Sequence, residues 1–194
     1  MSRAGSLKTP AMKTHIALLR AINVAGRNKV AMTDLRSVFA VLGYDNVRTV
    51  LQTGNVIFRS ESAASARLER QIEQALADRL GLTTDIILRS AAEWETLIAE
   101  NPFPDFARDD PSHLLAMPLK GLPAAGTLGA LRAAIKGRET VELIGRDLYI
   151  LYPDGIGRSK LTNALIDRTL GTRGTGRNWR TVLRIFENLR ESRE

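Results

Sequence analysis

The chain has 194 residues, of which 44% are hydrophobic and 25% are charged. This length is enough to bury a substantial core in one or two domains. The chain contains no cysteine, which excludes disulfides, thiolate metal centres and cysteine nucleophiles and fits a reducing compartment. Two histidines, His15 and His113, are too few for a histidine-rich metal site. No apolar run approaches the ~20 residues of a membrane span. We therefore expect a cytoplasmic protein without a metal or a cofactor.

The positive charge is concentrated in two stretches of the chain. The whole sequence has 28 basic and 21 acidic residues, a net charge of +7. The stretch 3–36 holds seven basic residues and one acid, and the stretch 158–184 holds the same numbers. The remainder is therefore net negative. Two basic zones can concentrate an anionic partner. The alternative is solvated surface charge that serves solubility.

The first part of the chain predicts a disordered tail followed by an α+β lobe. Residues 1–12 show no periodicity and are expected to be the tail. The lobe covers residues 13–100, and its elements follow from apolar periodicity, caps and turn residues. In order, it is predicted to contain strand 15–20, a helix capped by Thr33 and stopped by Gly43, strands 47–52 and 55–59 joined at Thr53-Gly54, helix 64–80, strand 84–88 and helix 91–100.

The second part of the chain repeats this order. Residues 101–112 contain three prolines and are predicted to connect the two lobes. The second lobe covers residues 113–194, and a glycine-rich loop stands where its last strand would be. Its predicted elements are strand 113–119, helix 128–135, strands 141–144 and 148–152, helix 159–170 and a terminal helix with Val182, Ile185, Phe186 and Leu189 on its apolar face.

The repeated order indicates an internal duplication. Thr14-His15 opens the first strand of one half as Ser112-His113 opens that of the other, and Arg20 and Lys120 close these strands. A β-α-β-β-α-β order is typical of ferredoxin-like domains, in which helices cover one face of an antiparallel sheet. The predicted fold class is therefore α+β, with two ferredoxin-like lobes and an extra C-terminal helix.

The loop 153–160 has the composition of a general anion site. Its glycines let the backbone approach a ligand, Ser159 can cap the following helix, and Arg158 and Lys160 add positive charge. The loop matches neither G-x-x-x-x-G-K-[ST] nor G-x-G-x-x-G, so nucleotide hydrolysis is unsupported. The alternative is a capped helix with surface charge.

Two further loops are rich in glycine and basic or amide side chains. The segment 171–180 contains three glycines, three arginines and Trp179, and Arg177 and Asn178 offer donors to a phosphate or carboxylate. The alternative is a turn with Trp179 packed as a hydrophobic anchor. The segment 23–29 is the equivalent loop after the first strand, and it offers Asn23 and Lys29.

Acidic side chains gather in the connector. Asp105, Asp109 and Asp110 lie close in sequence to His113 and could supply oxygen ligands to a divalent ion. Their spacing matches no specific metal. Polar loop side chains are the favoured interpretation, and we assign no metal site.

Two segments carry a resemblance to a known family. They are LLRAINVAGRNKVAMTDLRSVFAVLGYDNVRTVLQTGNVIF (18–58) and GIGRSKLTNALIDRTLGTRGTGRNWRTV (155–182). With them the chain resembles the bacterial domain-of-unknown-function family 1697, whose members carry LLRGINVGG-like, LQ-SGN-like, SKL-like and T-RNW-T-like segments. The resemblance spans about Lys13 to Leu189. It departs at Ala21, Ala25 and Thr53, where the family more often has Gly, Gly and Ser.

This resemblance implies a two-lobed α+β fold built from a ferredoxin-like duplication. It implies no activity, so we assign no catalytic residue and leave open whether the protein is an enzyme. The family motifs coincide with the basic, glycine-rich loops. The candidate ligand-binding residues are Arg20, Asn23, Lys29, Ser159, Lys160, Arg177, Asn178 and Trp179.

Three functions remain open at this point. The first is the binding of a small phosphorylated or nucleotide-like anion at the basic loops, for which Lys160→Ala or Arg177→Ala should remove binding without unfolding the protein. The second is a nucleic-acid-binding module, whose affinity would fall steeply with salt. The strand 15–20 lacks the aromatic side chains that an RNA-binding sheet uses for stacking. The third is a non-enzymatic interaction protein with an acidic partner.

Overall fold

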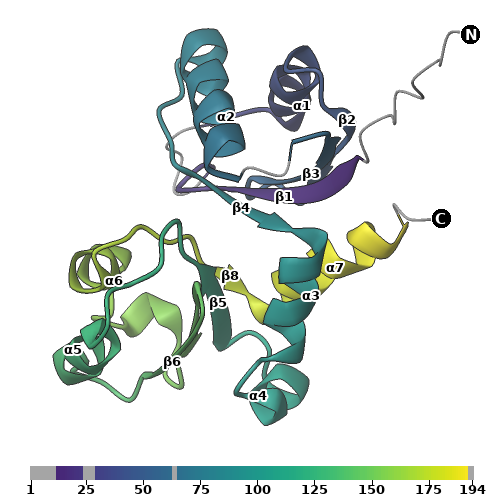
Figure 1. The fold of residues 1–194 in the computed structure, drawn as a ribbon. Coiled ribbons are helices and arrows are strands. Elements are labelled where there is room, and N and C mark those ends of the chain that lie inside the picture. Colours follow the sequence, from purple (N-terminus) through teal and green to yellow (C-terminus); the bar gives the residue numbers. More distant parts are fainter. Residues whose placement is uncertain (1–11, 24–28, 63–64, 192–194) are drawn as a thin grey trace, which may run out of the picture.

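The structure is a computed structural model that describes residues 12–23, 29–62 and 65–191. Residues 1–11 of the expected tail and most of loop 23–29 therefore lie outside the described residues. Within the described ranges there are seven α-helices, one 3₁₀ turn and two four-stranded antiparallel sheets (Figure 1). In chain order the elements are β1 (Lys13–Leu19), α1 (Met32–Val41), β2 (Asp45–Val50), β3 (Asn55–Ser60), α2 (Ser65–Leu80), β4 (Ile86–Ser90), α3 (Ala91–Ala99), α4 (Pro104–Asp109), β5 (Leu114–Pro118), α5 (Thr127–Ala134), β6 (Thr140–Ile144), β7 (Asp147–Leu151), η1 (Ile156–Arg158), α6 (Asn163–Leu170), β8 (Arg177–Asn178) and α7 (Trp179–Glu191).

The two sheets have the same strand order. The first is β2-β3-β1-β4 and the second is β6-β7-β5-β8. In each sheet the strand that comes first in the chain lies between the third and the fourth. A helix follows the fourth strand directly in both lobes, α3 after β4 and α7 after β8. The predicted α+β class is confirmed, the two sheets are consistent with two lobes, and the C-terminal helix has a counterpart in the first lobe.

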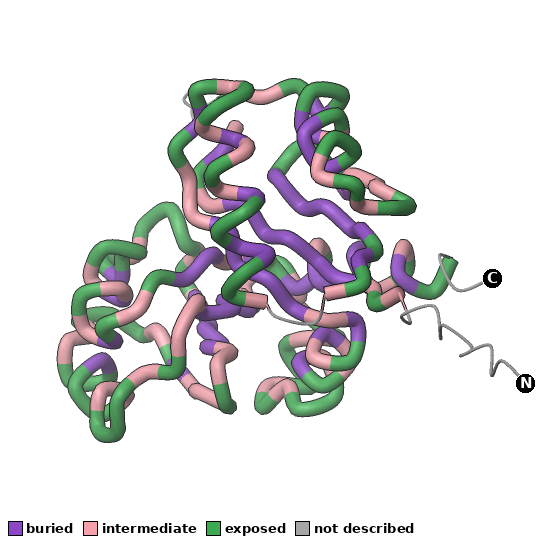
Figure 2. Tube along the Cα trace, turned by 45° about the horizontal axis from the view of Figure 1, so that its top comes forward, coloured by how far each residue is buried: buried purple, intermediate pink, exposed green. Residues whose placement is uncertain are grey.

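The layers follow from which face of each sheet is apolar. Helices α1 and α2 cover the outer face of the first sheet around Phe39 and Phe58, and α5 and α6 cover the outer face of the second around Leu131 and Ile150. The inner faces of both sheets share one core with α3 and α7, which lie between the lobes (Figure 1). Figure 2 shows the buried residues running along the sheets, with exposed residues on the outer sides of the helices.

Some boundaries differ from the sequence prediction for local reasons. The hairpin between β2 and β3 has four turn residues rather than two, because both Leu51 and Gly54 adopt positive φ (61° and 73°). The helix expected from residue 159 begins at Asn163, where the Thr162 hydroxyl accepts a hydrogen bond from the Leu165 N–H. Likewise, α1 begins at Met32, one residue before the expected cap Thr33.

The glycine-rich loop and the connector also contain elements that were not expected. β8 is a strand of two residues that pairs with β5, and the connector contains α4. Two residues give too little alternation for a strand to be recognised from sequence.

An arginine from each lobe inserts into the opposite lobe. Arg89 leaves β4, and its Nη2 donates to the carbonyl oxygens of Leu119 (3.1 Å) and Arg146 (2.8 Å) while its Nε donates to Asp147 (3.1 Å). Only 1% of the Arg89 surface is exposed. These acceptors lie at the end of β5 and the start of β7, so the side chain binds two strands of the other sheet.

Arg177 makes the reciprocal contacts from β8. Its Nη2 donates to the carbonyl oxygens of Leu19 (3.0 Å) and Gly54 (3.3 Å), and its Nε donates to Asn55 Oδ1 (2.5 Å). These acceptors lie at the end of β1 and the start of β3, the positions that correspond to those Arg89 uses in the second lobe. The two arginines therefore join the lobes in a nearly symmetric way.

We expect Arg177→Ala to destabilise the protein. The substitution removes the arginine donor from the buried Leu19 carbonyl and Asn55 amide oxygens, which should lower the free energy of unfolding by at least about 3 kcal/mol. The exposed Arg158 is the matched control, and Arg158→Ala should change that free energy by less than about 0.5 kcal/mol. Chemical denaturation measures both. Equal stability of the two variants would contradict the joining role of Arg177.

His15 is buried, with 2% of its surface exposed, and it stacks on Phe58 with ring centroids 5.3 Å apart. Burial lowers the pKa of His15 below its ordinary value near 6.5, because the charged ring is poorly solvated there. The folded state therefore favours the neutral ring, and stability is lost as the pH falls below about 6.5.

We expect the free energy of unfolding to fall less between about pH 7 and pH 5 in His15→Phe than in the unsubstituted protein. Phenylalanine keeps the stack on Phe58 but has no proton to take up. Denaturation curves at the two pH values test this, and parallel losses in both proteins would rule His15 out as a source of acid sensitivity.

Candidate functional site

The predicted ligand residues lie in two separate places. Of the predicted residues, Arg177 and Asn178 line a pocket at the junction of the lobes, whose lining does not include Arg20, Asn23 or Lys29. Ser159 and Lys160 line a different pocket within the second lobe. Among the described residues, the loop 153–160 and the segment 171–180 therefore line different pockets.

Asn23 and Lys29 flank the part of the first loop that lies outside the described residues. The Asn23 side chain closes this loop, since its Oδ1 accepts from the Val30 N–H (2.9 Å) and its Nδ2 donates to the carbonyls of Val30 (3.1 Å) and Gln52 (2.9 Å). Lys29 is exposed to solvent. The amide of Asn23 is thus used to shape the loop, while Lys29 contributes charge nearby.

Arg20 forms ion pairs across the lobes. Its guanidinium lies 2.6 Å from Asp167 in α6 and 3.8 Å from Asp85 just before β4. Lys120, at the end of β5, pairs in turn with Glu73 in α2. The charge of Arg20 is thus engaged by carboxylates of this chain.

Arg177 and Trp179 are committed to the interior. The guanidinium of Arg177 donates through all three of its nitrogens to protein oxygens, among them Thr175 Oγ1 at 2.8 Å. Trp179 is 3% exposed and belongs to the core between the sheets. The hydrogen bonds of Arg177 are thus made to protein oxygens, and the packing alternative describes Trp179.

Asn178 caps the last helix. Its Oδ1 accepts a hydrogen bond from the Thr181 N–H (2.9 Å), and its side chain is exposed. Ser90 does the same for α3, where its Oγ accepts from the Glu93 N–H at 3.2 Å. Thr181 in α7 therefore occupies the position that Glu93 occupies in α3.

The pocket at the junction is small. It encloses about 220 Å³ and lies where the end of β1, the β2–β3 turn and the start of α7 meet. Thr53 and Thr181 are hydroxyl-bearing residues of its lining; Thr53 lies in the LQ-SGN-like motif, whereas Thr181 was missed by the sequence interpretation. The full lining is Leu19, Ala21, Ile22, Thr53, Gly176, Arg177, Asn178 and Thr181.

The electrostatic environment of the two joining arginines differs. Burial lowers the pKa of Arg177 to about 10, and no carboxylate of the described residues offsets this effect. Burial also lowers the pKa of Arg89, but the charges of Asp147 and Glu93 act in the opposite direction. Asn55 stands where the second lobe has Asp147, so the charge of Arg177 is compensated only by neutral dipoles.

Near Arg89, Glu93 occupies the space that corresponds to the junction pocket near Arg177. Its carboxylate accepts from the Ser90 N–H (2.7 Å) at the start of α3 and from Arg146 (2.8 Å) in the β6–β7 turn. Burial acts to raise the pKa of Glu93, but the hydrogen bonds from Ser90 and Arg146 outweigh burial and hold it below its ordinary value. At α7, Thr181 stands in the position of Glu93 and Gly54 in that of Arg146. Neither residue is charged, and the pocket lies there.

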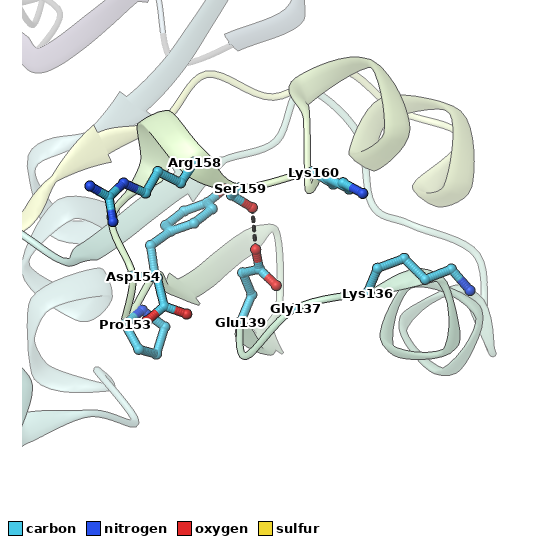
Figure 3. A pocket seen from close by; sticks show the side chains of 10 residues that line it. Lys136, Gly137, Glu139, Pro153, Asp154, Arg158, Ser159 and Lys160 are labelled. Carbon is cyan, nitrogen blue, oxygen red and sulfur yellow. Dashed lines mark hydrogen bonds between the residues drawn. The ribbon is translucent and has the colours of Figure 1, made fainter.

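Ser159 and Lys160 lie in the second pocket, shown in Figure 3. The Ser159 hydroxyl donates to the Glu139 carboxylate and accepts from the Leu161 N–H (2.9 Å), so Ser159 holds a turn rather than capping α6. Lys160 is exposed at the rim.

The connector acids serve local contacts. Asp105 and Asp109 pair with Arg108, and Asp110 hydrogen-bonds to His113. Within the described ranges, no three histidine, aspartate or glutamate side chains are grouped as a metal ion would require. None of the described helices has the length and apolar character that a membrane crossing requires.

Comparison with known proteins places the chain in a family. A fold comparison finds the structure of the conserved bacterial protein SP0830 from Streptococcus pneumoniae, with a TM-score of 0.69 and 21% identity, covering 91% of this chain and 98% of that one. This likeness concerns the fold alone. No curated protein matches the sequence. The family described as "Protein of unknown function (DUF1697)" matches residues 12–149. The resemblance inferred from the motifs is therefore confirmed, and the chain belongs to the DUF1697 family.

Proposed function

We propose that the pocket at the lobe junction binds a small anion through a phosphate or carboxylate group. The observation that carries this proposal is the buried charge of Arg177, which has no carboxylate partner among the described residues, whereas the equivalent Arg89 has Asp147. A buried cation is stabilised by a nearby anion because the low-dielectric interior screens charge weakly. A bound anion would supply the missing negative charge.

The start of α7 strengthens the same site. The first backbone N–H groups of a helix lack partners within the helix, and the helix dipole favours negative charge there. At α3 the chain provides such a charge itself through Glu93. At α7 the residue in that position is the neutral Thr181, which lines the pocket. The ligand's acidic group would take the place that the Glu93 carboxylate takes at α3.

The size of the pocket limits the ligand. Pockets for drug-sized molecules usually enclose about 300–1,000 Å³, and this one encloses about 220 Å³. Leu19, Ala21 and Ile22 give it an apolar wall, and Thr53 and Thr181 offer hydroxyls. A short carboxylic acid or a small monophosphate fits this volume and lining better than a whole nucleotide.

We also infer that the lobes are ferredoxin-like repeats, residues 13–100 and 113–194, that arose by duplication and are joined by the connector 101–112. The shared strand order supports this inference. The reciprocal contacts of Arg89 and Arg177 support it further, because each uses the end of the first strand and the start of the third in the opposite lobe. In this view the anion site arose from a difference between two originally equivalent positions.

Nucleic-acid binding receives less support from the structure than anion binding does. Ferredoxin-like RNA-binding modules stack bases on an open sheet face. Here one face of each sheet is covered by its own helices and the other by the core containing α3 and α7. The aromatic Phe58 and Tyr149 on these sheets are buried.

Substitution of Thr181 tests the proposal. Thr181→Glu should place a carboxylate where Glu93 lies at α3, reduce the affinity for phosphate and for short carboxylates by at least about tenfold, and stabilise α7 by about 0.5 kcal/mol. Thr181→Gln has a side chain of the same size without charge and should keep an affinity within about threefold of the unsubstituted protein. Calorimetric titration at constant ionic strength gives the affinities.

The shifts of the Gly176 and Thr181 amide resonances on titration identify the site. Equal affinity of all three proteins, or shifts confined to other residues, would show that the anion binds elsewhere. Absence of binding by the unsubstituted protein would overturn the proposal itself.

A further inference from the structure

The second lobe contains a separate pocket of about 260 Å³. It lies between the segment that joins α5 to β6 and the segment that joins β7 to α6 (Figure 3). Three cationic side chains, Lys136, Arg158 and Lys160, line it together with two carboxylates, Glu139 and Asp154. Whether this lining favours an anion or a cation depends on which of these charges is already engaged.

Both carboxylates are engaged by groups of the protein. Glu139 accepts a hydrogen bond from the Ser159 hydroxyl, and Asp154 pairs with Arg138 at 2.9 Å. Glu139 also packs against Gly137, where any side chain would collide with the carboxylate oxygens. The second carboxylate oxygen of Glu139 has no hydrogen-bond partner among the described residues, but it is buried and therefore not accessible to a ligand in this conformation. Neither acid is therefore well placed to receive a cationic ligand.

The three cations have no such partners. Among the described residues, Lys136, Arg158 and Lys160 form no ion pair, and all three are exposed. Figure 3 shows the amino groups of Lys136 and Lys160 extending on the same side of the pocket, while the Arg158 guanidinium extends on the opposite side. Positive charge is thus available at both ends of the pocket.

The turn that carries two of these cations is held in place. The Arg158 and Ser159 N–H groups donate to the Gly155 and Ile156 carbonyls in the 3₁₀ turn η1, and Ser159 links this turn to Glu139. Gly155 adopts a φ of 83°, which favours glycine. Arg158 and Lys160 are therefore attached to an ordered backbone, although their side chains can adjust to a ligand.

We propose that this pocket binds a small compound with two phosphate groups, such as a diphosphate, independently of the anion site at the lobe junction. An anion with charge at two positions can offer one group to Arg158 and the other to the two lysines, whereas a single phosphate offers only one group. Phosphate groups suit this lining because arginine donates to them bidentately and lysine binds them as a point charge. Ser159 and Glu139 position the turn and do not contact the ligand.

Inorganic pyrophosphate is the probe for this proposal, with orthophosphate at equal ionic strength as its comparison. Pyrophosphate should bind at least about tenfold more tightly than orthophosphate and should shift the amide resonances of Gly155, Gly157 and Lys160. Lys136→Ala and Lys160→Ala should each weaken binding about threefold to tenfold, and the double variant should weaken it further. Lys13→Ala removes an exposed lysine of the first lobe and should leave the affinity unchanged.

Three outcomes would overturn the proposal. They are equal affinity for the two anions, unchanged affinity of the double lysine variant, and resonance shifts confined to Gly176 and Thr181 at the lobe junction. Because all substituted lysines are exposed, their loss should not unfold the protein. A Thr181→Glu variant that still binds pyrophosphate with shifts at Gly157 would support two independent sites.

Discussion

The reciprocal insertion of Arg89 and Arg177 is the interaction on which the arrangement of this protein depends. Each guanidinium is buried and binds the end of one strand and the start of another in the opposite lobe. Buried arginine requires partners for its N–H groups, so the lobes can approach only where those oxygens are presented. This requirement places β4 beside the second sheet and β8 beside the first, and it brings α3 and α7 into one core. The pairs Arg20–Asp167 and Lys120–Glu73 add cross-lobe contacts at the strand ends.

Because the contacts of Arg89 and Arg177 are nearly symmetric, the differences between their surroundings are informative. At Arg89 the chain supplies Asp147 as a charged partner, and the adjacent space holds the ion pair of Glu93 with Arg146. At Arg177 the partner is the neutral Asn55, and the adjacent space is a pocket. The same fold thus contains one position that is complete within the chain and one that lacks negative charge. This difference is the basis on which we propose an anion for the lobe junction.

The sequence predicted the order of elements because apolar periodicity, glycine stops and turn residues are local signals. The ends of the individual elements were less predictable. Leu51 adopts a positive φ that no turn motif indicates, and β8 is only two residues long. The predicted ligand residues that line a pocket are divided between two separate pockets for a different reason. A glycine- and arginine-rich segment looks the same whether its arginine faces solvent or crosses into another lobe, and only tertiary packing decides that Arg177 is buried. The sequence did offer one signal of a buried arginine, because Arg89 directly follows the three apolar residues 86–88 of β4.

Net charge acquires a more specific meaning once the partner of each cation is known. The value of +7 includes cations that the chain already neutralises, such as Arg20 with Asp167 and Arg173 with Asp85. A cation that is paired with a carboxylate contributes little field at a distance, whereas an unpaired one continues to attract anions. The unpaired charge lies in two kinds of environment. Arg177 is buried and fixed, which favours a small ligand in one orientation, whereas Arg158 and Lys160 are exposed and adjustable, which favours a larger and more highly charged one. Burial therefore separates the two proposed anion sites, although both carry charge of the same sign.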